Sequence, residues 1–295
     1  MIPWPARYPA HEGLVGPARD QGELWRLVLG LIVAATGYIA LLQFYLGFVD
    51  TLIPIGEVEA GQSPGAMLGL LFSFGCLSAA VIGVTLVLHG RSLWTLIGAP
   101  WLWWRHFRLA LFAVAALAVV LAILPPWRPY GTPLVPGLPV GQWLSILPFA
   151  LLAVFIQTSA EELLFRGYLQ QQLAARFASP WVWMLVPSIL FALGHYAPAE
   201  AGDNALIIAA WSGLFGLLMA DITARTGSLG AAMAIHFANN VLAMLVMSIP
   251  DNLNGLALFV LPFGMEAPDR LLPLLWVDFV LMIVTWLAVR LAFRR

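Results

Sequence analysis

Eight long apolar runs dominate this chain and restrict what it can fold into. A helix needs about 20 mostly apolar residues to cross a lipid bilayer. Runs of about that length cover residues 25–48, 65–89, 107–124, 143–162, 181–197, 205–222, 229–249 and 271–291. The segments between them are rich in Pro or in charged residues, as loops are. We therefore predict an all-α, polytopic membrane bundle of about eight transmembrane helices.

The composition excludes a water-soluble domain. Apolar residues make up 61% of the chain and charged residues 10%, whereas a soluble domain carries about a quarter charged residues. So few charges cannot cover a surface that faces water, so we expect the lipid bilayer to surround the protein. The net charge of -1 provides no attraction to nucleic acid, which is not an expected partner.

The positive charges predict an orientation, because cytoplasmic loops are enriched in Lys and Arg. All fourteen basic residues are Arg. An N-terminus in the cytoplasm leaves only Arg128 and Arg270 outside and puts twelve on the inner side, which are Arg7, Arg19, Arg26, Arg91, Arg105, Arg108, Arg166, Arg176, Arg225, Arg290, Arg294 and Arg295. We predict an N-in, C-in topology in the inner (plasma) membrane.

The chain is expected to form one membrane domain behind a short polar segment. Residues 1–24 are polar and contain Pro, so we expect a cytoplasmic N-terminal segment rather than a cleavable signal peptide. Residues 25–295 are expected to form a single transmembrane helical domain, because they contain no internal repeat and no break.

Ionisable residues inside the apolar runs are costly, and they mark function by default. Six are candidates: Glu161, Glu162, His195, Asp221, His236 and Asp278. We expect Asp221, near the end of its run, to reach water. We expect Asp278, which lies deeper, to pair with another helix.

The segment Glu161-Glu162-Leu163-Leu164-Phe165-Arg166 ends the fourth run. Glu162 and Arg166 are four residues apart on one helical face and are expected to pair. Glu161 lies about 100° round the helix and points elsewhere. A solvated helix end is the alternative reading. In another alternative, the helix continues past Arg166 through Tyr168 to Ala175, which would place Glu161 deeper in the membrane than the end of its run suggests.

Two further runs carry histidines. His195 lies in the fifth run, where a lone His is more often structural than catalytic. His236 and Asn240 lie one turn apart in the seventh run, behind a start predicted at Gly227 with Ser228 as N-cap. An interhelical hydrogen-bond pair is the alternative reading of these two. Such groups on three separate runs are harder to explain as packing alone.

The chemistry that this set supports is hydrolysis. Glu161 can accept a proton from water, and His195 can help to hold that water. His236 and Asn240 can donate hydrogen bonds to a developing oxyanion, while Arg166 holds Glu162. In a second assignment, Glu161, His195 and His236 bind zinc and leave an open position for water.

These motifs resemble those of the CAAX-protease and bacteriocin-processing family of intramembrane proteases, also called CPBP or Abi. The family motifs E-E-x-x-x-R, F-x-x-x-H and H-x-x-x-N read here as Glu161-Glu162…Arg166, Phe191…His195 and His236…Asn240. The likeness covers about residues 143–249, the expected protease core. It implies a helical core whose active-site cavity opens to the cytoplasm and the bilayer. It also implies Glu161 with His195 as the water-activating pair and His236 with Asn240 at the oxyanion.

We therefore predict an intramembrane endopeptidase that acts on membrane-embedded or lipid-anchored proteins. Our preferred reading requires no metal, because Asn240 suits an oxyanion hole better than a zinc shell. The alternatives are a non-catalytic scaffold or immunity protein, and a proton-coupled carrier, which would show repeated halves that this sequence lacks. One point fits poorly: counted along its run, His195 lies deeper than Glu161.

Overall fold

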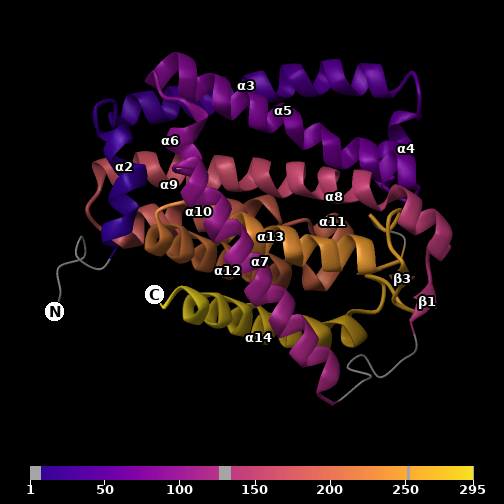
Figure 1. The fold of residues 1–295 in the computed structure, drawn as a ribbon. Coiled ribbons are helices and arrows are strands. Elements are labelled where there is room, and N and C mark those ends of the chain that lie inside the picture. Colours follow the sequence, from indigo (N-terminus) through magenta and orange to yellow (C-terminus); the bar gives the residue numbers. More distant parts are fainter. Residues whose placement is uncertain (1–7, 126–133, 251–252, 295) are drawn as a thin grey trace.

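The computed structural model describes residues 8–125, 134–250 and 253–294, and these form a bundle of apolar helices (Figure 1). Six helical stretches are long and apolar enough to cross a membrane: Leu24–Val49, Pro64–His89, Pro100–Ile123, Val140–Arg176, Pro198–Thr226 and Pro268–Phe293. Pro180–Gly194 and Gly230–Val246 are shorter apolar helices. Each coincides with one predicted run, which confirms an all-α, polytopic membrane protein.

Eight long helices form the bundle in the described residues, and α8 is continuous with α9. They are α3 (Leu24–Val49), α5 (Pro64–His89), α7 (Pro100–Ile123), α8 (Val140–Glu162) running into α9 (Gln170–Arg176), α10 (Pro180–Gly194), α12 (Ala205–Thr226), α13 (Gly230–Val241) and α14 (Pro268–Phe293). The short helix α2 (Glu12–Arg19) precedes them, and three more lie in the connections, namely α4 (Ile55–Ala60), α6 (Leu93–Ile97) and α11 (Pro198–Ala201).

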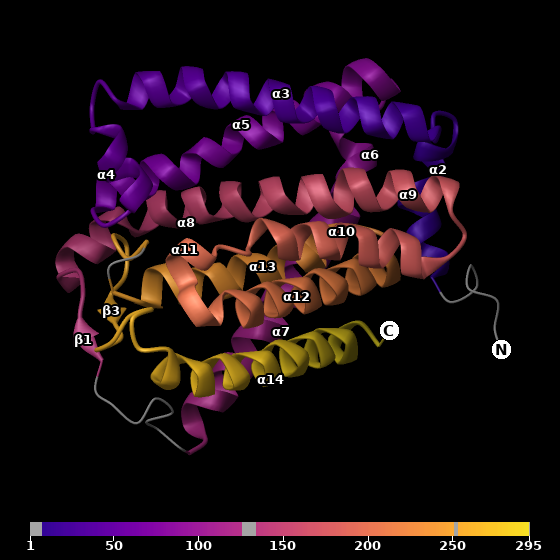
Figure 2. The same ribbon diagram turned by 180° about the vertical axis from the view of Figure 1, so that it is seen from behind.

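The helices are arranged in layers. Helices α3 and α5 pack together on one side, α8 lies beneath α5, and α13 lies beneath α8. Helix α7 crosses α13 obliquely, and α14 closes the far side against α7 and α12. Seen from behind, α10 and α12 lie side by side (Figure 2). Helix α13, which carries His236, is therefore enclosed by neighbours.

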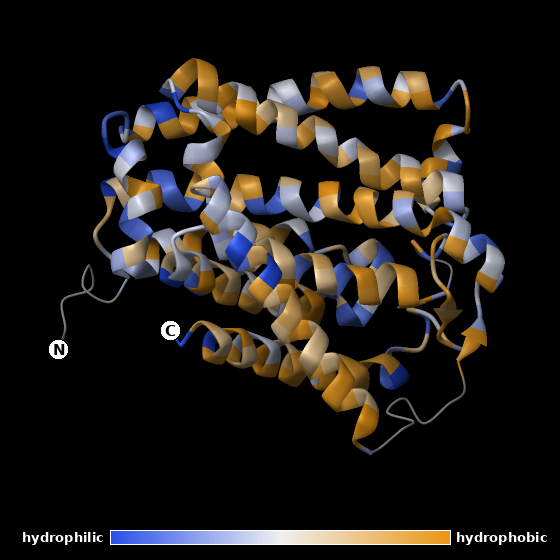
Figure 3. Cartoon of the chain, viewed as in Figure 1, coloured by the Kyte–Doolittle hydropathy of each residue, from blue (hydrophilic) through white to orange (hydrophobic). Residues whose placement is uncertain are grey.

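The surface of the bundle is apolar, as a lipid-facing surface must be. Phe44, Val87 and Leu291 are 81%, 89% and 78% exposed. Figure 3 shows apolar residues along the outer helices, with hydrophilic residues concentrated in the connections and toward the helix ends. Water would not tolerate so much apolar exposure, so the exposed side chains identify the multi-pass membrane protein that the composition predicts.

Two helix boundaries differ from the sequence prediction. Helix α7 begins at Pro100, seven residues before the predicted run, because Pro is favoured in the first turn of a helix. The fourth helix does not end at Glu162. It continues through a π-helical segment, Leu163–Leu169, and then through α9 to Arg176. The end at Glu162 was wrong, and the alternative prediction that the helix continues through Tyr168 to Ala175 is confirmed to within one residue. Polar residues in both places have partners in the bundle and do not stop the helix.

The connection before α13 is partly as expected. Gly227 has a φ of 71°, the left-handed conformation that ends α12. Ser228, however, is not the N-cap, since α13 begins at Gly230 with Leu229 as its N-cap residue. The hydroxyl of Ser228 lies 2.7 Å from Nδ1 of His106 on α7. Ser228 thus contacts His106 of another helix instead of forming the predicted capping bond to its own helix.

The connections at the opposite end form a small sheet. Strand β3 (Phe259–Val260) pairs antiparallel with β1 (Val135–Pro136) and parallel with β2 (Met247–Ser248). Its backbone hydrogen bonds tie the loop before α8 to the loop after α13. The sheet therefore fixes the two site-bearing helices relative to each other at this end.

The described chain begins and finishes at the same end of the bundle (Figure 1), in keeping with the predicted N-in, C-in topology. Which end faces the cytoplasm stays a prediction. Arg7, Arg128 and Arg295 lie outside the described residues. Arg166, counted among the inner charges, is fully buried within the bundle instead, because it pairs with Glu162.

The N-terminal segment packs onto this end of the bundle. Leu14 and Ala18 of α2 are fully buried, and α2 packs against α9. His11, just before α2, is buried with its Nε2 lying 3.4 Å from Nε2 of Gln170. The hydroxyl of Tyr8 donates to Asp221 of α12. The segment is therefore part of the folded domain.

Candidate active site

Two helices, α8 and α13, bring five of the motif residues together in the middle of the bundle. Glu161 and Glu162 end α8, directly before the π-helical segment that contains Arg166. His236 and Asn240 lie one turn apart on α13, which packs against α8. A second π-helical segment, Leu242–Val246, follows directly after this pair. Such π-helical turns are rare and are frequently found at functional sites.

Glu162 is the hub of the buried charges. Its Oε1 accepts a hydrogen bond from Nη1 of Arg166 at 2.9 Å and lies 2.8 Å from Nδ1 of His236. Both Glu162 and Arg166 are almost completely buried, and the guanidinium also lies over the ring of Phe191 at 4.9 Å. The predicted Glu162–Arg166 pair is confirmed, and it holds the imidazole of His236.

Glu161 lies beside this hub and is held by amides. Its Oε1 accepts a hydrogen bond from Nε2 of Gln157 at 2.9 Å, and Oε1 of Gln157 accepts one from Nδ2 of Asn240 at 2.8 Å. The other oxygen, Oε2, lies 3.4 Å from Nε2 of His236. Among the described residues, this buried oxygen accepts no hydrogen bond. Buried oxygens of this kind are uncommon and call for an explanation.

The contacts of His236 assign its tautomer. An ionised carboxylate only accepts hydrogen bonds, so Nδ1 of His236 must carry the proton that faces Glu162. In the neutral imidazole, Nε2 then has a lone pair and cannot donate to Glu161. Oε2 of Glu161 lies 3.4 Å from this nitrogen, and no hydrogen bond joins the two atoms. Two proton acceptors thus face one another.

His195 stands apart from these residues. It is exposed and follows the last residue of α10, with its Nδ1 2.8 Å from the backbone oxygen of Phe191. Within the described part of the chain, no contact joins it to Glu161 or to His236. The ring of Phe191 lies between the two histidines, 4.4 Å from His195 and 6.2 Å from His236. A carbonyl only accepts, so Nε2 of His195 is the free acceptor.

The depth of His195 does agree with that of Glu161. Glu161 lies fifteen residues before Arg176, where α9 ends, and His195 lies fifteen residues after Pro180, where the antiparallel α10 begins. The rings of Phe165 and Phe191 pack at 5.1 Å and hold the two helices in this register. The apparent mismatch came from ending the fourth helix too early.

Gln157 is a site residue that the sequence reasoning missed. It is buried, and it connects Asn240 to Glu161. The signal was its place one turn before Glu161 on an apolar helix, where a polar side chain must find a partner.

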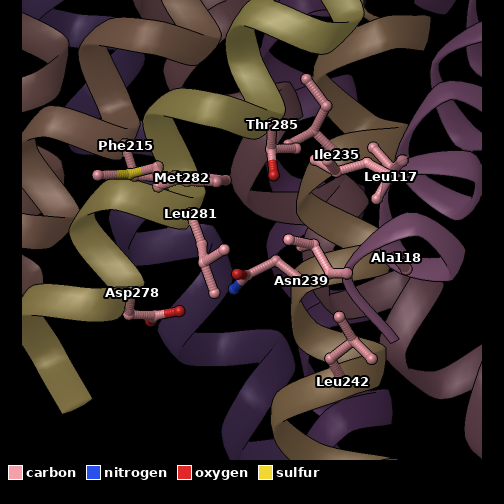
Figure 4. Close-up of a pocket in the computed structure, with 12 residues that line it drawn as sticks. Leu117, Ala118, Phe215, Ile235, Asn239, Leu242, Asp278, Leu281, Met282 and Thr285 are labelled. Carbon is pink, nitrogen blue, oxygen red and sulfur yellow. The ribbon is translucent and has the colours of Figure 1, made fainter. Parts of the chain in front are cut away.

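The two aspartates set aside from the site differ from each other. Asp221 is buried rather than exposed to water, because Arg225, Tyr8 and Trp286 bond its carboxylate at 2.7, 2.9 and 3.1 Å. The expectation that it reaches water was wrong. Asp278 lines a cavity between helices α7, α12, α13 and α14 (Figure 4).

The set proposed for zinc is not assembled. Nowhere in residues 8–125, 134–250 and 253–294 do three His, Cys, Asp or Glu side chains gather in a way that would bind one metal ion. Glu161 and His236 are neighbours, but His195 does not join them.

Comparisons with known proteins match the segment that carries these motifs. Residues 142–242 match the family model described as type II CAAX prenyl endopeptidase Rce1-like. A protein of Bacillus subtilis (strain 168) described as uncharacterized protein YyaK is 32% identical over 118 residues, which are 39% of this chain. The match covers 38% of that relative's own length. No solved structure matches. The family resemblance predicted from the three motifs is thus confirmed for residues 142–242 of this chain, as a likeness to the Rce1-like CAAX endopeptidases.

Proposed function

We propose that this protein is an intramembrane endopeptidase that hydrolyses peptide bonds in membrane-embedded or lipid-anchored proteins. One observation carries the proposal. Oε2 of Glu161 is buried, accepts no hydrogen bond in the described residues and faces Nε2 of His236 at 3.4 Å. A carboxylate oxygen left open beside an oriented imidazole is suited to take a proton from water. The match of residues 142–242 to a CAAX endopeptidase family supports the same reaction class.

In the proposed reaction, Glu161 removes a proton from the attacking water. The water oxygen forms a bond to the scissile carbonyl carbon while the carbonyl oxygen gains negative charge. Glu161 then delivers the proton to the departing amine nitrogen as the C–N bond breaks. Gln157 holds Oε1 of Glu161 at 2.9 Å, which leaves Oε2 for this proton transfer. General acid–base catalysis of this kind contributes about 10²–10⁴-fold to a rate.

Asn240 and His236 are placed to stabilise the oxyanion. Nδ2 of Asn240 has two N–H groups, and only one is needed for its bond to Gln157. His236 faces the same space with its Nε2, and its Nδ1 is held by Glu162. Removing one oxyanion donor costs an enzyme about 10²–10³ in kcat.

We assign His195 to the rim of the site. Phe191 fixes its Nδ1, so its Nε2 is directed outward as an acceptor that can hold water or a substrate N–H group. In this arrangement His236, rather than His195, is the histidine next to Glu161. We propose that the site faces the cytoplasm, an orientation supported by the excess of Arg at the end that carries both termini.

A purely structural role for these residues predicts a different pattern. Buried polar groups that only hold helices together are bonded to each other. The network around Asp221 fits that description, since Tyr8, Arg225 and Trp286 all bond the carboxylate. Oε2 of Glu161, in contrast, accepts no hydrogen bond in the described residues. Oε2 of Glu162 also accepts none, so what distinguishes Glu161 is that its open oxygen lies 3.4 Å from Nε2 of His236, in the motif segment that matches an endopeptidase family.

The test compares membrane proteomes from cells that produce the wild type or Glu161→Ala. New protein N-termini found with the wild type and absent with Glu161→Ala would support the proposal. The matched control is Glu57→Ala, which removes an exposed glutamate of α4. Equal amounts of folded protein, checked by melting temperature, are required for each variant. The same N-termini in all three samples would contradict the proposal.

A further inference from the structure

A cavity of about 520 Å³ lies where α3 begins and α9 ends. One wall is the link between α2 and α3, and the other is the last turn of α9. The walls are close to each other, since a Cβ on Gly22 of the link would lie 3.4 Å from the Cβ of Ala175. The volume falls within the range of about 300–1,000 Å³ that is typical of sites for organic ligands.

The cavity lies at the level of the lipid headgroups. Leu24 begins one membrane-spanning stretch and Arg176 ends another, and both residues line the cavity. Trp25, in the first turn of α3, lines it as well and is 57% exposed. Trp is enriched at the membrane–water interface, because its ring is apolar and its N–H group is polar. A ligand in this cavity is therefore within reach of the headgroups of one leaflet.

Two of the four charged residues that line the cavity already have partners. Arg19 pairs with Glu12 at 2.7 Å. Glu23 pairs with Arg26 at 3.1 Å. These charges cancel in pairs, so they do not require a counter-charge from a ligand.

Asp20 and Arg176 are the other two charged residues of the lining. Both are exposed. In the described parts of the chain, neither forms an ion pair or a side-chain hydrogen bond, and they do not pair with each other across the cavity. The space between them is thus bounded by a carboxylate, which accepts hydrogen bonds, and a guanidinium, which donates them. A ligand that complements both must carry a positive and a negative group close together.

Phosphatidylethanolamine has both groups in its headgroup. Its phosphate suits a guanidinium, which donates parallel N–H bonds to such oxyanions. Its primary ammonium follows the phosphate after a short ethylene link and can donate to a carboxylate. The acyl chains can continue along Leu24 and Val28 of α3, which are 43% and 56% exposed. Headgroup and chains thus both find matching surfaces at the start of this helix.

Two other common phospholipids fit the lining less well. Phosphatidylglycerol has a phosphate without a cation, so it leaves Asp20 without a positive partner. Phosphatidylcholine has a quaternary ammonium with no N–H to donate, and proteins bind such groups in cages of aromatic rings. One face of the Trp25 ring is already covered by the guanidinium of Arg26, 4.7 Å from its centroid. No other described residue of the lining is aromatic. The lining therefore favours the ethanolamine headgroup.

We infer that this cavity binds the headgroup of phosphatidylethanolamine, with the phosphate at Arg176 and the ammonium at Asp20. A lipid held there joins the α2–α3 link to the end of the continuous helix that carries Glu161. Binding does not depend on the proposed reaction, because neither residue belongs to the candidate active site.

Binding is tested by native mass spectrometry of the purified full-length protein in detergent. Phosphatidylethanolamine, phosphatidylglycerol and phosphatidylcholine with the same acyl chains are added in equal amounts. The wild type should retain phosphatidylethanolamine in preference to the other two. Its melting temperature should rise most with that lipid, because a ligand that binds the folded state stabilises it. Equal retention of the three lipids by the wild type would overturn the inference.

Single substitutions separate the two charges. Asp20→Asn leaves the guanidinium alone, so the preference should shift toward phosphatidylglycerol. Arg176→Gln leaves the carboxylate alone, so retention of phosphatidylethanolamine should fall about 2–5-fold, the range for an exposed charge pair. Both side chains are exposed, so each variant should melt like the wild type when no lipid is added. An unchanged preference in Asp20→Asn, or unchanged retention in Arg176→Gln, would exclude these residues as the binding groups.

Asp269→Asn and Arg270→Gln are the matched controls. They make the same changes of charge at two exposed residues in the first turn of α14, at the opposite end of the bundle. Both should keep the lipid preference of the wild type. A loss as large as that in the cavity variants would mean that retention follows net charge and would overturn the site.

Free phosphoethanolamine distinguishes a lipid from a soluble ligand with the same chemistry. The headgroup alone should raise the melting temperature less than the lipid, because it lacks the acyl chains that contact α3. A rise as large as that with the lipid would assign the cavity to a soluble ligand and overturn the lipid as its occupant.

Discussion

Nδ1 of His236 lies 2.8 Å from Oε1 of Glu162, the same oxygen that accepts a hydrogen bond from Arg166. One buried carboxylate oxygen thus fixes a guanidinium from its own helix and an imidazole from another. This contact fixes the orientation of the His236 ring. With Nδ1 held by Glu162, Nε2 of His236 is aimed at Oε2 of Glu161, so that Glu162 and Arg166 act as positioning residues.

Removing the charge of Glu162 is expected to destabilise the fold strongly. Glu162→Gln leaves Arg166 charged and unpaired in the interior, a change that costs about 3–5 kcal/mol. The double variant Glu162→Gln/Arg166→Met should recover much of that loss, because it removes the unpaired charge as well. Melting temperatures of the two single variants and the double variant provide the measurement. Strictly additive losses would show that the two side chains do not interact.

Glu161→Gln is expected to keep the fold and to lose activity. The amide retains the shape of the side chain and can still bond Gln157, but it cannot accept a proton from water. Cleavage should fall by about 10²–10⁴-fold while the melting temperature stays near that of the wild type. Glu57→Gln on the exposed helix α4 should leave both unchanged. Activity retained in Glu161→Gln would remove this residue from the mechanism.

Substitutions of the two histidines are expected to differ in their effects on stability and on activity. His195 is exposed and bonds only a backbone carbonyl, so His195→Gln should change stability by no more than about 0.5 kcal/mol. Its cleavage rate should fall nonetheless, because the free Nε2 is lost. His236→Gln should lower both stability and rate, since it disturbs the bond to Glu162. A His195→Gln variant that cleaves as fast as the wild type would exclude the rim role.

Docking of the N-terminal segment is expected to weaken in acid. Burial lowers the pKa of His11 from 6.5 to about 4; the charge of Glu12 raises this pKa by less, and the charge of Arg19 lowers it slightly further. The folded state therefore favours neutral His11, whose Nε2 faces the N–H of Gln170. The unfolded segment binds the extra proton between pH 6.5 and 4, so this stabilisation is complete above about pH 6.5 and is lost as the pH falls toward 4.

The loss amounts to about 3 kcal/mol when the pKa difference is converted at 1.36 kcal/mol per unit. Hydrogen exchange of the amides in α2, followed from pH 7 to pH 4.5, measures it directly after correction for the intrinsic exchange rate. His11→Gln keeps a hydrogen-bond acceptor but does not titrate, so its α2 should be insensitive to pH. Equal pH sensitivity in His11→Gln and the wild type would assign the effect to another group.

Close packing of α7 on α13 is expected to make Gly230 sensitive to substitution. A Cβ at this position would overlap the backbone oxygen of Trp103 and come within 2.9 Å of the backbone nitrogen of Phe107. Backbone atoms cannot move aside cheaply, so Gly230→Ala should cost about 1–3 kcal/mol. Gly47→Ala is the control, because a Cβ on that helical glycine meets open space. A melting temperature unchanged in Gly230→Ala would mean that α7 and α13 are packed less closely than described.

Much of the architecture follows from the sequence alone. Twenty consecutive apolar residues have few alternatives to a membrane helix, since each backbone polar group must be bonded within its own segment. The pairing of Glu162 with Arg166 follows from a spacing of four residues, which is a property of one helix. Helix ends were harder to predict. Glu161, Glu162 and Arg166 look like the polar end of a span, yet the helix continues to Arg176.

The contacts between helices could not be predicted. Spacing along α13 puts His236 and Asn240 on one face, but it does not specify whether that face meets α8 or lipid. The structure pairs His236 with Glu162 and Asn240 with Gln157, and it gives Ser228 to His106 rather than to the helix cap. It also leaves His195 at the rim, although its motif suggested a place beside Glu161.

The burial of the ionisable residues and the contacts between them are thus determined at two different levels. The sequence by itself determined that Glu161, Glu162 and His236 lie in apolar spans, because hydrophobic patterning and the cost of a charge in lipid are local properties. Only the tertiary structure decided which of them touch. Contacts between α8, α10 and α13 depend on how whole helices pack, and that packing leaves Oε2 of Glu161 open while every acceptor of Asp221 is engaged.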